Sequence, residues 1–416
     1  MTAVVSLLVA APSAAHGQSW NQWRGANRDG ISPGIAWPDS LAESVLRQAW
    51  RVDDLGASYS SPVVQDGTVY VTVSHDARTE GVTALDATTG QRLWSRSWPV
   101  SFAMPAFMSK HGSWPKSTPA VEGDDLLFFG IGEHLYSLDS QTGELRWSLD
   151  FPTRFATPVP EFGCSTSPLV TADSVYVQAA GSLFGLDRES GEVRWRSFNL
   201  YATAGGEAED ELEAYGSPIL AKLSGTEQIV ANTVQGLIGV DPRTGAVLWR
   251  VVPNRDVDDS PNITPVIWGD RVLVSTESSG TVLYKVAQSK GTFRVEEIWR
   301  SRVHGNMSSP VVAGDHAYLH LKNGRLALLD LKNRREAWIS KESFGAYASL
   351  VGRGSRLLML TGDGDLKLLP FDPEGLRELD TRKVAEHTWA HLAAQENRVY
   401  VRTSSSLIAY EWAARP

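Results

Sequence analysis

Short runs of apolar residues, many alternating with polar ones, recur along the chain and are separated by turn-forming residues. In the first such unit Pro62 opens an apolar run, Asp66 and Gly67 form a hairpin turn, and residues 68–72 alternate as in a half-buried strand. A third run covers residues 82–85 and a fourth covers residues 91–95. The pattern predicts a sheet of four short antiparallel strands, which buries its faces only by stacking against similar sheets.

The unit repeats along the chain, because the spacing Asp-x3-Gly-x3-Trp begins at Asp86, Asp139, Asp187 and Asp241. A fifth copy runs from Asp330 to Trp338 with Arg334 in place of glycine. The aspartate is expected to accept backbone N–H groups across the turn, and the glycine to supply a positive φ. A large apolar ring at this position is expected to pack between neighbouring sheets. We assign this structural role to Trp50, Trp94, Trp147, Trp195, Trp249, Trp299 and Trp338.

A second recurring element, Ser or Thr followed by Pro, precedes each copy and sets the number of sheets. The element begins at Ser61, Thr118, Ser167, Ser217, Thr264 and Ser309. The series then continues without proline at Ser349 and His391. Eight such anchors predict an all-β fold, a single closed eight-bladed β-propeller of four-stranded antiparallel blades. The last blade lacks a fourth strand near Tyr410, and an orphan strand ends at Trp50. We therefore expect this N-terminal strand to complete the last blade.

The N-terminus predicts export. Residues 3–11 are apolar and are followed by small residues up to Gly17, which resembles a secretory signal peptide with cleavage after Gly17. The expected organisation is a signal peptide at residues 1–17, an extension packing on the propeller at 18–44, and the propeller at 45–416. No other stretch reaches 18 apolar residues, so we expect a soluble monomer without a membrane span, in the periplasm or outside the cell.

Charge and cysteine content exclude several kinds of partner and site. A net charge of −9 without basic blocks makes nucleic acid an unfavourable partner. Cys164 is the single cysteine of the sequence, so an intrachain disulfide, a cysteine-based zinc site and a CxxC redox pair are all excluded.

The repeat carries a family resemblance. The pattern Asp-x-x-Thr-Gly-x-x-x-Trp, as in Asp86 to Trp94, resembles the pyrroloquinoline quinone (PQQ)-type propeller repeat and differs from the WD40 pattern. Residues 20–30 resemble the start of many exported single-propeller proteins. The resemblance implies either the quinoprotein dehydrogenases, which hold PQQ and calcium over the channel, or the non-catalytic branch that includes the outer-membrane β-barrel assembly lipoprotein. The chain lacks the adjacent cysteines and long insertions of the former, and the lipidated cysteine of the latter.

The candidate binding face consists of the connections that lead from each fourth strand to the next blade. The longest cover residues 95–116, 148–164, 196–214 and 250–261, and the first carries an unusual load of large apolar side chains. The proposed face comprises Phe107, Met108, His111, Trp114, Phe162, Tyr215, His304, His387, Trp389 and His391. The alternative is a structural cap, in which the first loop folds onto its own small core.

The histidines and the acidic loops each allow a ligand-binding and a structural interpretation. The four histidines of this face either converge on a metal or small anion or are hydrogen-bonded structural groups. Residues 254–259 offer oxygen ligands for calcium or form a solvated acidic loop, and residues 207–213 are most simply solvated. We assign no catalytic and no metal-binding residue, and leave cofactor-binding residues unassigned.

Three functions follow as hypotheses. The first is a non-enzymatic exported scaffold that binds a protein or an envelope component, without a cofactor. The alternative is a PQQ-dependent oxidoreductase using PQQ and calcium, which the single cysteine and short loops disfavour. The third is a hydrolase or lyase acting on an extracellular polymer, which requires converging carboxylates in the channel.

Overall fold

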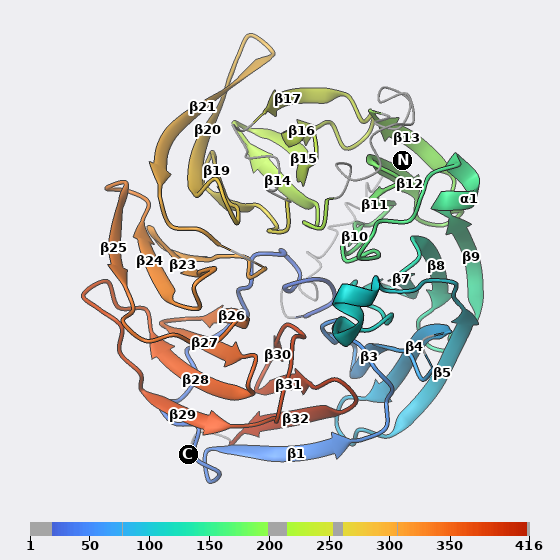
Figure 1. The fold of residues 1–416 in the computed structure, drawn as a ribbon, viewed down its shortest axis with the longest axis horizontal. Coiled ribbons are helices and arrows are strands. Elements are labelled where there is room, and N and C mark those ends of the chain that lie inside the picture. The colour runs from blue at the N-terminus through green and yellow to red at the C-terminus, as the bar shows by residue number, and fades with distance from the viewer. Residues whose placement is uncertain (1–18, 77, 199–213, 253–260, 306, 414–416) are drawn as a thin grey trace, which may run out of the picture.

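Eight four-stranded antiparallel sheets stand around a central axis as the blades of a closed propeller (Figure 1). The computed structural model describes residues 19–76, 78–198, 214–252, 261–305 and 307–413. The predicted leader at 1–17 and the acidic segments 207–213 and 254–259 lie outside these residues. The predicted all-β eight-bladed architecture is confirmed.

The first four blades follow the chain order. Blade 1 consists of β2 (Val63–Gln65), β3 (Thr68–Val73), β4 (Thr79–Asp86) and β5 (Arg92–Pro99). Blade 2 consists of β6 (Ala120–Glu122), β7 (Asp125–Phe129), β8 (His134–Asp139) and β9 (Leu145–Asp150). Blade 3 consists of β10 (Leu169–Val170), β11 (Ser174–Ala179), β12 (Ser182–Asp187) and β13 (Val193–Ser197). Blade 4 consists of β14 (Ile219–Leu223), β15 (Thr226–Thr233), β16 (Gly236–Val240) and β17 (Val247–Val251).

The next three blades repeat the same order, and the described connections contain two short helical segments. Blade 5 consists of β18 (Val266–Trp268), β19 (Arg271–Ser275), β20 (Thr281–Ser289) and β21 (Thr292–Ser301). Blade 6 consists of β22 (Val311–Ala313), β23 (His316–His320), β24 (Leu326–Asp330) and β25 (Arg335–Ile339). Blade 7 consists of β26 (Ala348–Arg353), β27 (Arg356–Thr361), β28 (Asp365–Pro370) and β29 (Asp380–Lys383). The helical segments are η1 (Ala106–His111) and α1 (Phe151–Phe155).

Blade 8 joins the two ends of the chain, as predicted. Its strands are β30 (Ala393–Gln395), β31 (Arg398–Arg402), β32 (Leu407–Trp412) and β1 (Leu46–Val52). β1 pairs antiparallel with β32 from Leu46 opposite Trp412 to Val52 opposite Leu407, with one irregularity after Gln48. Figure 1 shows β1 as the outermost strand beside β32. This pairing covers the edge of β32 and gives blade 8 its fourth strand.

The repeated turn and tryptophan form one interblade joint. Trp94 Nε1 donates to the Ser140 carbonyl (3.0 Å), in the Asp-x3-Gly turn of the next blade. Gly143 of that turn has φ 71°, and a Cβ there would lie 2.6 Å from Trp94 Cε3. Glycine is therefore required both by its backbone conformation and by the ring stacked against it. The same bond is repeated by Trp50 to Ala87, Trp147 to Arg188 and Trp195 to Pro242.

Trp249 departs from this joint, because blade 5 replaces the Asp-x3-Gly turn with the long β20–β21 hairpin. The indole of Trp249 instead donates to Gln228 Oε1 of its own blade (2.5 Å). Trp338 donates to the Asp372 carbonyl of blade 7 (3.1 Å). Trp299 is half-buried and packs in the apolar cluster between blades 5 and 6.

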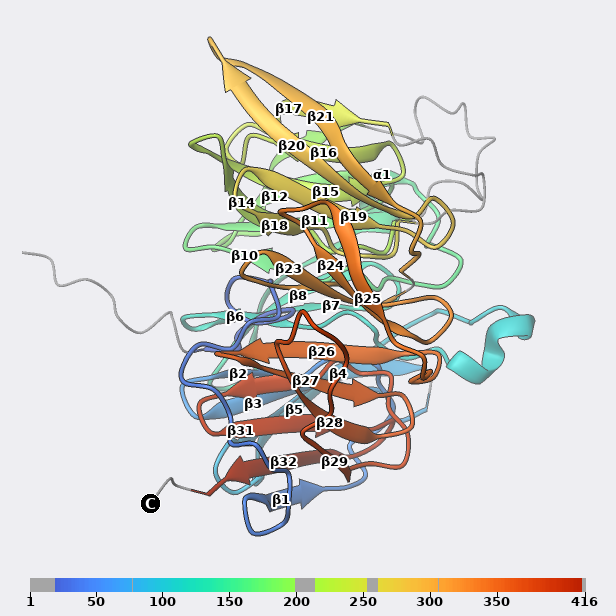
Figure 2. The same cartoon turned by 90° about the vertical axis from the view of Figure 1, so that its left-hand side faces the viewer.

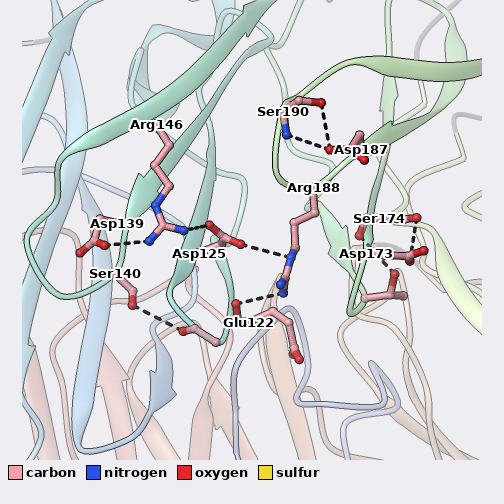
Figure 3. Close-up of polar contacts among 12 residues, drawn as sticks. Glu122, Asp125, Asp139, Ser140, Arg146, Asp173, Ser174, Asp187, Arg188 and Ser190 are labelled. Carbon is pink, nitrogen blue, oxygen red and sulfur yellow. Dashed lines mark hydrogen bonds and ion pairs between the residues drawn. The ribbon is translucent and has the colours of Figure 1, made fainter.

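A charged network adds to the joint between blades 2 and 3. Arg146 bridges Asp125 and Asp139 within blade 2, and the Arg146–Asp139 distance is 2.8 Å. Arg188 reaches across from the turn of blade 3 to Asp125 (3.1 Å) and to the Glu122 carbonyl (3.1 Å) (Figure 3). The carboxylate of Asp125 therefore has a guanidinium partner in each blade.

The Ser/Thr anchors form a hydrogen-bonded belt around the channel. The Ser61 N–H donates to Thr118 Oγ1 (3.1 Å), and the Thr118 N–H donates to Ser167 Oγ (3.0 Å). The series continues from Ser167 to Ser217, from Ser217 to Thr264 and from Thr264 to Ser309. Each hydroxyl thus satisfies a buried backbone donor of the preceding blade, which explains why Ser or Thr recurs at this position.

Residues 20–32, which we call the channel pin, cross the centre of the ring. Trp20 pairs with Val64 of blade 1, and the Ser32 N–H donates to the Gly352 carbonyl of blade 7 (2.8 Å). Between them Arg28 donates to the carbonyls of Ser167 (3.0 Å) and Pro168 (2.7 Å). Arg24 donates to the Pro310 carbonyl of blade 6. Both guanidinium groups therefore hydrogen-bond carbonyls of the anchor elements.

The pin and the η1 connection lie toward opposite faces of the ring. In Figure 2 η1 projects from one side of the ring, and the blue chain that follows residue 18 lies on the other side. After the pin, residues 33–45 run along blades 7 and 8, where Trp37 stacks on Trp412 with ring centroids 5.4 Å apart. No helix in the described part of the chain is long and apolar enough to cross a membrane.

Candidate functional site

A pocket of about 430 Å³ is lined by Met108 and His111 of η1, by Trp23 of the channel pin and by residues that precede the first strands of the blades. Its lining includes the residue two positions before the anchor in every blade. These eight residues, which we call the entry ring, are Tyr59, Lys116, Ser165, Tyr215, Asn262, Met307, Tyr347 and Trp389. Alternation along the extended segment before each first strand explains the pattern, because residues two apart point the same way. Because the repeat occurs eight times, one sequence position supplies the whole entry ring.

The ring is aromatic on one side. Trp389 of blade 8 stacks with Tyr59 of blade 1 and with Tyr347 of blade 7, each with ring centroids 5.9 Å apart. His111 from η1 adds a tilted contact to Trp389 at 5.1 Å. We call Tyr347, Trp389 and Tyr59 the aromatic wall. Burial raises the pKa of both tyrosines above the ordinary value, so their hydroxyls stay protonated at neutral pH.

The rest of the ring carries more polar groups, although the Tyr215 ring contacts Phe162 of the lining at 6.3 Å. These groups belong to Lys116, Ser165, Tyr215 and Asn262 of blades 2 to 5, which we call the polar side. Lys116 Nζ donates to the Phe162 carbonyl (2.7 Å). The carboxylate in the described lining is Glu277, and it pairs with Lys322 at 2.9 Å. Both charged groups are therefore engaged within the chain.

The floor of the pocket comes from the channel pin and blade 8. Trp23 of the pin donates through Nε1 to Thr264 Oγ1 (3.2 Å) and contacts His391 edge to face at 5.0 Å. The imidazole of His391 is buried, and its Nδ1 lies 2.8 Å from the Leu392 carbonyl, which can only accept. Burial, together with the nearby charge of Arg24, lowers the pKa of His391 to about 3. His391 is therefore neutral at physiological pH.

The rim is apolar and exposed. Phe107 of η1 has 71% of its surface exposed, and its ring contacts Phe162 of the lining at 6.2 Å. Met307 of blade 6 is 44% exposed, and Met104 and Met108 also line the pocket. Three of the five methionines of the chain thus surround one pocket. Methionine and aromatic groups in this arrangement are typical of adaptable binding surfaces.

The structure brings most of the proposed binding residues together. Met108, His111, Phe162, Tyr215, Trp389 and His391 line the pocket. Phe107 lies on its rim, and Trp114 packs edge to face against Tyr59 at 5.4 Å. His304 lies instead in a second pocket of about 610 Å³ between blades 5 and 6, and His387 is exposed outside both linings. In the described part of the chain no three His, Cys, Asp or Glu side chains gather as metal ligands.

Several lining residues were missed by the sequence analysis. Trp23 lies in the segment 18–44, which the sequence analysis predicted to pack on the propeller without saying where. Tyr59, Lys116 and Tyr347 carried no visible motif of their own, yet each lies two residues before an anchor. Reading that one position through all eight repeats would have found the ring.

Comparison with known proteins identifies the family to which the chain belongs. A family model described as outer membrane protein assembly factor BamB matches residues 46–110 and 78–340, more than half of the chain. The chain belongs to this BamB family. The solved structure of BamB from Moraxella catarrhalis superimposes with a TM-score of 0.63 at 15% identity, covering 89% of this chain and 99% of that one.

Quinoprotein dehydrogenases share the fold. Quinohemoprotein alcohol dehydrogenase from Comamonas testosteroni gives a TM-score of 0.70 at 15% identity, covering 97% of this BamB-family chain and 82% of that chain. Among curated proteins, the serine/threonine-protein kinase AfsK of Streptomyces griseus is 32% identical over 161 residues, 38% of this chain and 18% of the kinase. Quinoprotein ethanol dehydrogenase of Pseudomonas aeruginosa is 24% identical over 196 residues, 43% of this chain and 28% of that protein. The matches span less than a third of these curated relatives, so they bear on the propeller alone.

Proposed function

We propose that this BamB-family chain is a non-enzymatic, exported scaffold that binds a protein of the cell envelope through its η1 face. The observation that carries the proposal is the entry-ring pocket, which Trp23 of the pin helps to line and at whose rim Phe107 and Met307 are exposed. Its volume falls in the usual range of ligand pockets, about 300–1,000 Å³. Export rests on the apolar residues 3–11 and on the family, whose description names an outer membrane assembly factor.

The lining fits the quinone cofactor poorly. PQQ is a planar quinone with three carboxylates, so its site needs several cationic or N–H donors and, for calcium, a set of oxygen ligands. The described lining supplies one lysine, which already binds a carbonyl, and one glutamate, which already binds a lysine. Arg24 lies below the pocket, but its guanidinium bonds the carbonyls of Asp29 and Pro310. We therefore derive no redox step for this site.

The hydrolase or lyase hypothesis has even less support. Acid–base cleavage of a glycosidic bond needs two carboxyl groups that flank the bond. Glu277 is the single carboxylate in the described lining, and it pairs with Lys322, so the described lining does not offer the two flanking carboxyl groups.

A capture experiment tests the proposal. The full chain, cross-linked to an envelope extract, should retain a specific protein, and Phe107→Glu or Met307→Glu should abolish retention by adding charge to the rim. Leu145→Glu is the matched control, because Leu145 on β9 is also exposed (50%) but lies on an outer strand. Retention unaffected by both rim variants would refute the proposal. So would a bound chromophore with dye reduction after addition of PQQ and calcium.

A further inference from the structure

The two sides of the entry ring differ in chemistry, and this difference specifies a ligand. The aromatic wall lies in blades 7, 8 and 1, which are adjacent in the closed ring. The polar side begins beside it in blade 2 and continues through blades 3 to 5, which lie opposite the aromatic wall. A ligand that fills the pocket must therefore offer an apolar ring to one side and hydrogen-bonding groups to the other.

The charge of the lining favours an uncharged ring. Lys116 and Glu277 are each engaged within the chain, and His391 at the floor is neutral. A cationic group placed against the aromatic wall would gain from the ring quadrupoles. Apart from Glu277, which is paired with Lys322, the described lining offers a cation no carboxylate, and the buried Arg24 adds positive charge near His391. An uncharged aromatic ring meets neither repulsion nor an unmatched desolvation cost.

The rim favours a protein over a small molecule. Phe107 lies outside the pocket but contacts Phe162 of the lining, so the apolar surface continues from the interior to the outer face. A small ligand confined to the pocket would leave Phe107 in water, whereas a protein segment crossing the rim would cover it. An extended segment also carries one N–H and one C=O per residue, which suit the hydroxyl and amide groups of Ser165, Tyr215 and Asn262.

Resting on the proposed function, we propose that the entry ring receives an uncharged aromatic side chain carried by an extended segment of the protein partner. The side chain stacks on Tyr347, Trp389 and Tyr59, while its backbone lies toward the polar side and its neighbours cover Phe107 and Met307. This geometry matches interface hot spots, in which a buried aromatic anchor in a pocket supplies most of the binding energy.

Selection from a random-peptide phage library on the immobilised full chain tests the assignment. The enriched peptides should share one Trp, Phe or Tyr, and replacing that residue by Ala or Lys should weaken binding at least tenfold in fluorescence anisotropy. N-acetyl-tryptophanamide at millimolar concentration should displace the labelled peptide, and N-acetyl-lysinamide should not. Enriched peptides without a shared aromatic residue would overturn the inference.

Two variants of the chain locate the binding site. Ser165→Trp fills the pocket from the polar side, and Met108→Glu places a charge beside it; each should weaken the peptide at least tenfold, with Leu145→Glu as the unaffected control. Melting temperatures identify any variant that fails to fold, and the other variant then decides. Peptide binding unaffected by a folded pocket variant would overturn the inference. If envelope capture still depends on Phe107 and Met307 in that case, the proposed function stands while the aromatic anchor is rejected.

Discussion

At the scale of a residue, His391 shows how one anchor position accepts a different side chain. Its Nδ1–H donates to the carbonyl of the next residue, Leu392, as the Ser61 hydroxyl does to Pro62 (3.1 Å) in blade 1. The imidazole is larger and titratable, and burial keeps its pKa at about 3, far below the ordinary value. The unfolded chain therefore binds a proton at a pH where the folded chain does not.

This difference predicts an acid-sensitive contribution to stability. The neutral His391 favours the folded state above pH 6.5, and this contribution is lost as the pH falls from 6.5 toward 3. His391→Ser keeps an equivalent hydrogen bond and removes the titration. Between pH 6.5 and 4.5 the wild type should lose on the order of 2 kcal/mol more unfolding free energy than the variant. Urea unfolding at both pH values measures this, and equal losses would contradict the argument.

At the scale of the element, the Asp-x3-Gly turn of one blade and the tryptophan of the preceding blade act as a unit. The aspartate closes the turn, as Asp139 does by accepting the backbone N–H groups of Gln141 (3.0 Å) and Thr142 (2.9 Å). The turn then presents a carbonyl to the indole N–H and a glycine to its face. Within one blade, the turn contacts the preceding blade and the tryptophan contacts the following blade. The Asp-x3-Gly-x3-Trp spacing therefore sets how far apart these two contacts lie along the chain.

Two glycines separate ring contact from backbone strain. Gly143 and Gly123 have φ of 71° and 58°, so alanine is strained at both. A Cβ at Gly143 would also overlap Trp94, whereas at Gly123 nothing lies within 4 Å. Gly143→Ala should therefore cost about 1–3 kcal/mol more unfolding free energy than Gly123→Ala, the usual range for overpacking. Equal losses in denaturant unfolding would show that the ring contact carries no weight.

At the scale of the whole molecule, the segment before residue 53 holds the ring together twice. β1 closes blade 8 from the outside, and the channel pin bonds to blades 1, 3, 6 and 7 from the inside. Buried arginines that bond carbonyls are costly to desolvate, and their pKa values fall to about 10 for Arg24 and 9 for Arg28. Both remain charged at neutral pH and satisfy several buried acceptors at once.

Removal of residues 1–52 should therefore open the propeller. The truncated chain loses the fourth strand of blade 8 and every contact of the pin, so it exposes the β32 edge and the carbonyls of the anchors. We expect a sharply lower melting temperature and a larger radius of gyration in small-angle scattering. An unchanged melting temperature would contradict this closure.

The sequence by itself determined the blade count, the closure of the ring and most of the interblade tryptophan contacts. These features depend on short spacings that recur in each repeat, and they are specified locally by turn chemistry and strand alternation. Trp249 shows the limit, because its partner depends on the hairpin that blade 5 happens to present.

Only the tertiary structure decided the candidate site. The entry ring combines one residue from each of eight blades with Trp23 of the pin, and these side chains meet because the ring closes around a common axis. His304 has the same sequence surroundings as His111, and His387 lies in the same segment as His391. Both His304 and His387 nevertheless lie outside the lining of the entry-ring pocket. Local spacing fixes which way a residue points within its blade. The route of the connecting loops and of the pin fixes which residues reach the channel mouth.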